Sequence, residues 1–166
     1  MDASRQSEQA PTKNVTSVER NSDREVVVTR WFNASARLVF EAWSTPDLFR
    51  RWWVPKSMGM TLHSCEMDVR TDGRYRLGFG DGMDFFGRYL EVTPPSRIVW
   101  TNEEGGDNGS ITTVTLTEQD GKTLLVMSEL YPSKEALDAD GAGAADATHE
   151  TFEQLDELLV ELASES

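Results

Sequence analysis

The pattern of hydrophobic and polar positions predicts strands and helices in a simple order. Residues 25–32 are rich in β-branched and aromatic side chains, which favours a strand. Apolar residues at helical spacing then predict a helix over 36–43 and a shorter helix from Pro46 to Trp53. Six further β-rich runs follow, covering 61–69, 74–79, 84–92, 97–102, 111–117 and 123–130. Because short turn sequences separate these runs, we expect an antiparallel meander.

A long amphipathic helix is predicted to follow Pro132. Phe152, Leu155, Leu159 and Leu162 lie on one face of that helix, and this apolar stripe has to be buried against the sheet. The small residues of 141–147 would either bring the helix close to the sheet or leave a cavity, and periodicity does not choose between the two. The whole pattern predicts an α+β fold in which a curved antiparallel sheet carries segregated helices.

The two ends of the chain differ from the middle. Residues 1–23 carry few apolar side chains, so we expect a disordered tail and an ordered chain that begins near Arg24. Residues 24–163 form a single predicted domain, and 164–166 form a short C-terminal tail.

Composition narrows the classes of partner. The 166-residue chain has 16 basic and 29 acidic residues, a net charge of -13, which argues against nucleic acid and anionic membranes as partners. Much of this charge lies on the solvated face of the last helix. The single cysteine, Cys65, cannot form an internal disulfide, and no cysteine cluster suggests zinc. No signal-peptide core or membrane-spanning stretch is evident, so we expect a cytoplasmic protein.

Several short motifs, in this order and spacing, resemble the SRPBCC (START/birch-allergen-like) superfamily. The closest resemblance is to the bacterial stand-alone branch named after the activator of the ninety-kDa heat-shock chaperone ATPase. The matching segments are 36–43 with Thr45-Pro46, 51–53, 64–70, 87–95, 97–101, 121–124 and 152–159. The resemblance covers about residues 24–163. It implies a helix-grip fold, in which an antiparallel sheet grips the long C-terminal helix and a cavity lies between them.

The resemblance implies less about function than about fold. Members of the superfamily bind lipids, hormones and polyketides, some are cyclases, and the eukaryotic namesake regulates a chaperone. Two departures from the family pattern stand out. Asp72-Gly73 replaces the usual pair of glycines, and Ser128 stands where this subgroup often has histidine. The second departure removes a candidate base from the cavity.

Five aromatic residues are expected around the cavity, because most of them share a strand face with other apolar residues. They are Trp53, Tyr75, Tyr89, Trp100 and Phe152. The alternative is that these rings fill an ordinary core. The polar candidates for the same cavity are His63 and Glu91, each of which could instead be structural or solvent-exposed. The residue spacing indicates no metal site, no cofactor and no catalytic set.

Three functions remain open at this point. The first is a non-catalytic domain, a monomer or weak homodimer, that binds a hydrophobic small molecule in the cavity. The second is a cyclase-like enzyme that uses His63, Tyr75, Tyr89 or Glu91 as acid or base. The third is a protein-interaction module similar to the chaperone regulator. A sizeable cavity would favour the first two, and a pair of polar groups within hydrogen-bond reach inside it would favour the enzyme.

Overall fold

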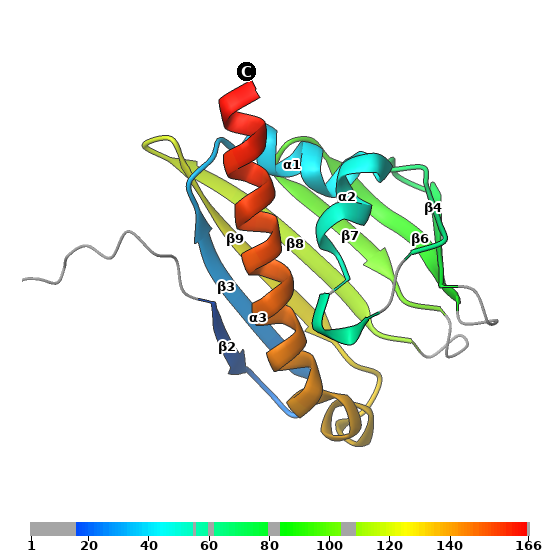
Figure 1. Ribbon diagram of the computed structural model, residues 1–166. Helices are drawn as coiled ribbons and strands as arrows, with labels where there is room; N and C mark the ends of the chain where they lie inside the picture. Colours follow the sequence, from blue (N-terminus) through cyan, green and yellow to red (C-terminus); the bar gives the residue numbers. More distant parts are fainter. Residues whose placement is uncertain (1–15, 55, 60–61, 80–83, 104–108, 166) are drawn as a thin grey trace, which may run out of the picture.

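The computed structural model describes residues 16–54, 56–59, 62–79, 84–103 and 109–165, and the side chains of Met58, 139–147 and Glu165 lie outside this description. In the described part of the chain, eight antiparallel strands form one curved sheet in the order β2-β3-β9-β8-β7-β6-β5-β4. The strands are β2 (Ser17–Arg20), β3 (Glu25–Phe32), β4 (Ser64–Met67), β5 (Arg74–Gly78), β6 (Asp84–Thr93), β7 (Arg97–Thr101), β8 (Ile111–Gln119) and β9 (Lys122–Leu130). Helix α3 (Lys134–Glu165) lies across one face of this sheet (Figure 1).

Two short helices follow β3 and lie near the C-terminal end of α3 (Figure 1). Helix α1 (Ala36–Ser44) begins after Ser35, whose hydroxyl accepts a hydrogen bond from the Leu38 N–H at 3.2 Å. Helix α2 (Pro46–Trp52) starts with proline, which suits the first helical position because that residue needs no N–H partner. A short 3₁₀ turn, η1 (Lys56–Met58), leads on toward β4.

Turn chemistry sets the register of the last hairpin. Asp120 and Gly121 both have positive φ, at 55° and 81°, which matches the twist of a two-residue hairpin turn. The next pairs on either side are Gln119 with Lys122 and Glu118 with Thr123. The predicted Asp120-Gly121 turn is therefore present. The predicted turn at Asp81-Gly82 lies outside the described residues, as does most of the glycine-rich loop before β8.

Strand β2 lies inside the segment for which the sequence predicts no order. Ser17–Arg20 pairs with the β3 residues Val26–Thr29, so the ordered chain begins before Arg24. All four side chains of β2 are exposed, and backbone pairing rather than apolar burial holds the strand to the sheet. Arg20 also forms an ion pair with Asp138 of α3 at 2.8 Å. An exposed strand of this kind leaves no alternating hydrophobic signal in the sequence.

The core lies between α3 and the concave face of the sheet. Phe152, Leu155 and Leu159 of the predicted stripe are all buried. A buried ion pair also joins the two layers, because Arg30 of β3 is 2% exposed and reaches Asp156 of α3 at 3.0 Å. This is the predicted helix-grip fold, with α3 continuing to Glu165 and β4 shorter than the predicted run over 61–69. The small side chains of 141–147 are not described, so their effect on packing stays a prediction.

Candidate ligand-binding site

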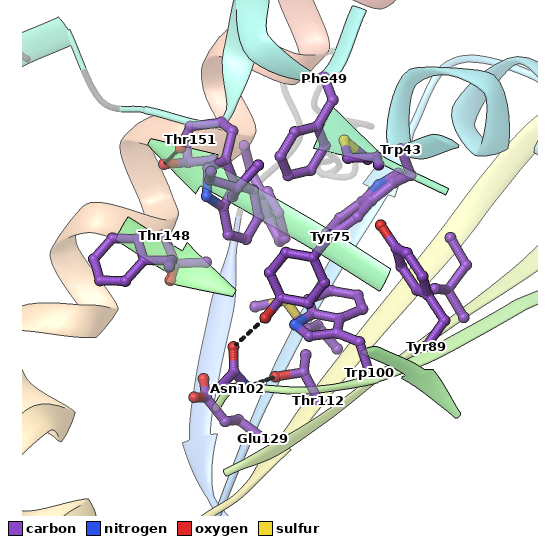
Figure 2. Close-up of a pocket in the computed structure, with 17 residues that line it drawn as sticks. Trp43, Phe49, Tyr75, Tyr89, Trp100, Asn102, Thr112, Glu129, Thr148 and Thr151 are labelled. Carbon is purple, nitrogen blue, oxygen red and sulfur yellow. Dashed lines mark hydrogen bonds between the residues drawn. The ribbon is translucent and has the colours of Figure 1, made fainter. Parts of the chain in front are cut away.

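A pocket of about 380 Å³ lies between α3, the α2 region and the concave face of the sheet (Figure 2). Its walls come from α1, the α2 region, α3 and strands β4 to β9. Eight of the seventeen lining residues are aromatic, and most of the others are aliphatic, methionine or threonine. A concave, mostly apolar space with a few polar groups is typical of sites for small molecules.

Rings packed on rings form one end of the pocket, which we call the aromatic end. It consists of four lining residues, Trp43, Phe49, Trp53 and Phe152, and of Trp52, which packs against them without lining the pocket. The Trp43 and Trp52 ring centroids lie 4.8 Å apart, nearly edge to face, and Phe49 stacks on Trp53 at 4.8 Å. Trp52 is fully buried and donates its indole N–H to the Ala42 carbonyl at 3.0 Å. The Trp43 Nε1 atom is also buried and has no hydrogen-bond partner.

Helix α3 fixes the position of Trp53 at this end through the backbone around it. The Gln154 side-chain amide donates to the carbonyls of Trp52 and Val54, both at 2.9 Å, and its oxygen accepts from the Lys56 N–H. The Thr151 hydroxyl donates to the Trp53 carbonyl at 3.3 Å. These bonds satisfy the backbone groups left open where α2 ends, and they hold the Trp53 ring against the pocket.

Hydrogen-bonded polar side chains form the opposite end of the pocket, which we call the polar end. It consists of four lining residues, Tyr75, Asn102, Thr112 and Glu129, and of Ser110, which joins Asn102 to Glu129 without lining the pocket. The Tyr75 hydroxyl donates to the Thr101 carbonyl at 2.7 Å and lies 3.3 Å from Asn102 Oδ1. Asn102 Nδ2 donates to the hydroxyls of Ser110 and Thr112, and Ser110 donates to the Glu129 carboxylate at 2.9 Å. Figure 2 shows Tyr75, Asn102, Thr112 and Glu129 grouped below the rings.

A glycine makes this arrangement possible. Gly87 of β6 pairs directly with Tyr75 of β5, and a Cβ atom at Gly87 would lie 2.1 Å from the Thr101 carbonyl oxygen of β7. No side chain other than hydrogen fits at this close approach of two strands. Because Gly87 leaves the space above β6 open, the Tyr75 ring can cross that strand and reach Thr101 and Asn102.

Tyr89 lies beside Tyr75, with ring centroids 5.7 Å apart, but belongs to neither end of the pocket. Its ring is buried, and its hydroxyl forms no hydrogen bond with another described residue. Burial raises the pKa of the Tyr89 hydroxyl, and the nearby Cys65 thiol and Asp68 carboxylate raise it further. Burial also raises the pKa of the Cys65 thiol, against the opposing effect of Arg50. Both groups are therefore protonated at neutral pH, and the thiol is a poor nucleophile.

The structure brings all five aromatic candidates to the pocket and leaves both polar candidates outside it. Trp53, Tyr75, Tyr89, Trp100 and Phe152 line the pocket. His63 is exposed in the bend before β4, where its backbone N–H donates a hydrogen bond to the Gly78 carbonyl. Glu91 forms a surface ion pair with Arg97 at 3.2 Å.

A β-bulge explains the position of Glu91. Tyr89 pairs with Trp100, but Glu91 pairs with Val99 instead of Ile98, so one residue is inserted between the two pairs. The insertion turns Glu91 to the outer face of the sheet, because paired residues share a face and Ile98 is the one that lines the pocket.

The pocket also contains polar residues that the sequence reasoning missed, namely Asn102, Thr112, Glu129, Thr148 and Thr151. Glu129 was within reach of the sequence, since it alternates with Leu125 and Met127 on one face of β9. Ser128, the position often occupied by histidine, lies on the other face and bonds to Glu25. The absence of histidine at this position therefore removes no group from the pocket.

The described residues contain no group of three or more His, Cys, Asp or Glu side chains placed to hold a metal ion. None of the described helices is long and apolar enough to cross a bilayer.

Residues 33–160 match the model of the family described as Activator of Hsp90 ATPase homolog 1-like protein. This match covers most of the chain and includes all seventeen residues that line the pocket. The chain belongs to this family, which lies within the superfamily whose fold the motifs resemble. None of the curated proteins matches the chain significantly.

Solved structures share the fold at low sequence identity. A protein from Rhodobacter sphaeroides is 24% identical, with a TM-score of 0.78 over 89% of this chain and 99% of that one. A protein from Nitrosomonas europaea is 20% identical, with a TM-score of 0.76 over 86% and 98% of the two chains. CalU16 from Micromonospora echinospora is 19% identical, with a TM-score of 0.62 over 92% and 91%. At these identities the similarity concerns the fold alone.

Proposed function

We propose that this chain is a non-catalytic binding domain that holds a hydrophobic small molecule between α3 and the sheet. The observation that carries the proposal is the pocket of about 380 Å³, which is large enough for a small ligand and mostly apolar. Burial of an apolar ligand there would remove its surface and that of the aromatic rings from water, which favours binding. The presence of the pocket also favours a binder over a protein-interaction module.

A fluorescence titration with the neutral, environment-sensitive dye prodan tests this proposal. We expect saturable binding to the folded protein, with an emission shift to shorter wavelength. Thr148 lines the pocket from α3, so Thr148→Phe should fill part of the space and weaken dye binding by about ten-fold, equivalent to ~1.4 kcal/mol. The matched control is His149→Phe, because the neighbouring His149 side chain is 52% exposed and does not line the pocket.

Circular dichroism first confirms that both variants are folded, so that a change in dye binding reports on the pocket and not on unfolding. Weak binding by Thr148→Phe together with parent-like binding by His149→Phe supports the pocket as the site. Absence of saturable dye binding to the parent protein would overturn the proposal. Equal binding by both variants would also overturn it, because the dye would then lie elsewhere.

A cyclase-like enzyme is the second candidate, and one observation favours it. Tyr75 and Asn102 form a pair of polar groups within hydrogen-bond reach in the pocket, and the Glu129 carboxylate lies at the same end. We rank it second because His63 and Glu91, two of its four proposed acids and bases, lie outside the pocket. Native mass spectrometry of the purified protein distinguishes the two, since a binder releases its captured molecule unchanged after incubation and an enzyme releases a product.

A further inference from the structure

The pocket has one acidic side chain and no basic side chain in its wall. Among its seventeen lining residues, Glu129 is the one acidic side chain, and none is lysine, arginine or histidine. An apolar site with a single carboxylate does not suit an anionic ligand, because burying two like charges together is costly. It suits a ligand that brings either no charge or one positive charge.

The hydrogen bonds of the polar end run in one direction. The Asn102 amide donates to the hydroxyls of Ser110 and Thr112, and the Ser110 hydroxyl donates to Glu129. The chain of donors thus ends on a carboxylate, which accepts hydrogen bonds and donates none. A ligand group that meets this end of the network is favoured if it is a hydrogen-bond donor.

Aromatic rings line the same pocket as this carboxylate. Tyr75 and Trp100 belong to its wall together with Glu129, and Figure 2 shows the Tyr75 hydroxyl pointing toward Asn102 at the end where Glu129 lies. The face of an aromatic ring carries partial negative charge and attracts cations, most strongly in tryptophan. A carboxylate in a pocket lined by tryptophan and tyrosine rings is a combination that suits an ammonium group.

Resting on the proposed function, we propose that the ligand is a hydrophobic amine that binds as its ammonium form. Its apolar body occupies the space against the aromatic end, and its ammonium group lies at the polar end beside Glu129, in a pocket whose wall includes the rings of Tyr75 and Trp100. The net charge of -13 adds a long-range field that attracts cations to the protein.

Three small molecules with one naphthalene body and different charges test this inference. Naphthylmethylamine is cationic at neutral pH, naphthylmethanol is neutral and naphthylacetate is anionic, and each competes with prodan. We expect the amine to displace the dye about ten-fold more tightly than the alcohol, with the anion weakest. Glu129→Gln should remove about ten-fold of the affinity for the amine and change that for the alcohol by less than about two-fold.

Glu91→Gln is the matched control, because it removes the same charge from the outer face of the sheet. Its affinities should equal those of the parent protein. Dye binding without preference for the amine would overturn the inference and leave the proposed function intact. An unchanged amine affinity in Glu129→Gln, or an equal loss in Glu91→Gln, would overturn it as well. Failure of prodan itself to bind the parent would overturn the proposed function and this inference together.

Discussion

Rings in mutual contact build the aromatic end of the pocket, whereas a chain of hydrogen bonds builds the polar end. At the aromatic end, Trp52 and Phe152 are at most 1% exposed, and their packing joins α2 to α3. At the polar end, Asn102 and Glu129 are only half-buried, and they bond to neighbours on the same sheet. Burial against another layer stabilises a fold more than half-exposed hydrogen bonds within one layer.

The difference separates two tasks within one cavity. Residues of the aromatic end hold the helices on the sheet as well as walling the pocket, so they cannot change without loss of stability. Residues of the polar end contribute less to the core and, under the proposed function, are free to set which ligand group is accepted. Related proteins with this fold could therefore keep the same stability while differing in the ligand they bind. The predictions below test this separation, beginning with the largest effect.

Phe152→Ala should cause the largest loss of stability, about 3–5 kcal/mol in the free energy of unfolding. Phe152 is 1% exposed, and its ring contacts Phe32 at 5.8 Å and Trp43 at 6.4 Å between centroids. Chemical denaturation followed by tryptophan fluorescence measures the change. The control is Phe85→Ala, which removes a 37%-exposed ring from the pocket wall and should cost less than about 1 kcal/mol. Equal costs would show that the aromatic end does not hold the fold.

Asn102→Ala should cost about 1–3 kcal/mol, an intermediate effect. The variant leaves the buried hydroxyls of Ser110 and Thr112 without the amide that donates to them. Asn21→Ala is the control, because it removes an exposed bond to Glu25 and should change stability by less than about 0.5 kcal/mol. A loss for Asn102→Ala as large as that for Phe152→Ala would break the distinction between the two ends.

The sequence predicted most of the fold because period-two patterns and turn residues are local signals. Strands β3 and β5 to β9 lie where alternation and turns place them, within a few residues. Strand β2 was not predicted, because its four exposed residues have no buried face. Its position depends on backbone pairing with β3, which follows it in the chain. Pairing of this kind is a property of the tertiary structure and is not visible in composition.

The aromatic side of the site was also predictable, whereas its polar side was not. Ring residues share a face with apolar neighbours, so Tyr75, Tyr89 and Trp100 were expected at the cavity. Glu91 follows the same alternation, but the bulge after Tyr89 reverses its face, and a bulge has no reliable local signature. Glu129 had the right alternation, but a half-buried carboxylate and an exposed one look alike in a sequence.

Tyr89→Phe should remove part of the loss of stability at alkaline pH. Because burial raises the pKa of the Tyr89 hydroxyl in the folded state, the unfolded chain releases this proton first, near its ordinary pKa of about 10. Above that pH the free energy of unfolding decreases by up to about 1.4 kcal/mol for each pH unit, until the folded-state pKa is reached. Denaturation curves at a series of pH values above 10 should therefore fall less steeply for the variant than for the parent. Parallel curves would show that the hydroxyl reaches solvent.

Glu129→Gln should have the smallest effect on stability, within about 0.5 kcal/mol of the parent. The glutamine carbonyl can still accept the hydrogen bond from Ser110, and the position is half-buried on the rim of the network. Glu91→Gln, on the outer face, should change stability by a similarly small amount, since exposed ion pairs contribute little. Thermal and chemical unfolding of both variants measure this directly. A loss above about 2 kcal/mol for Glu129→Gln would assign the carboxylate to the folding core. Near-parent stability would instead mean that a change in amine binding at Glu129 reports on the ligand contact and not on a damaged fold.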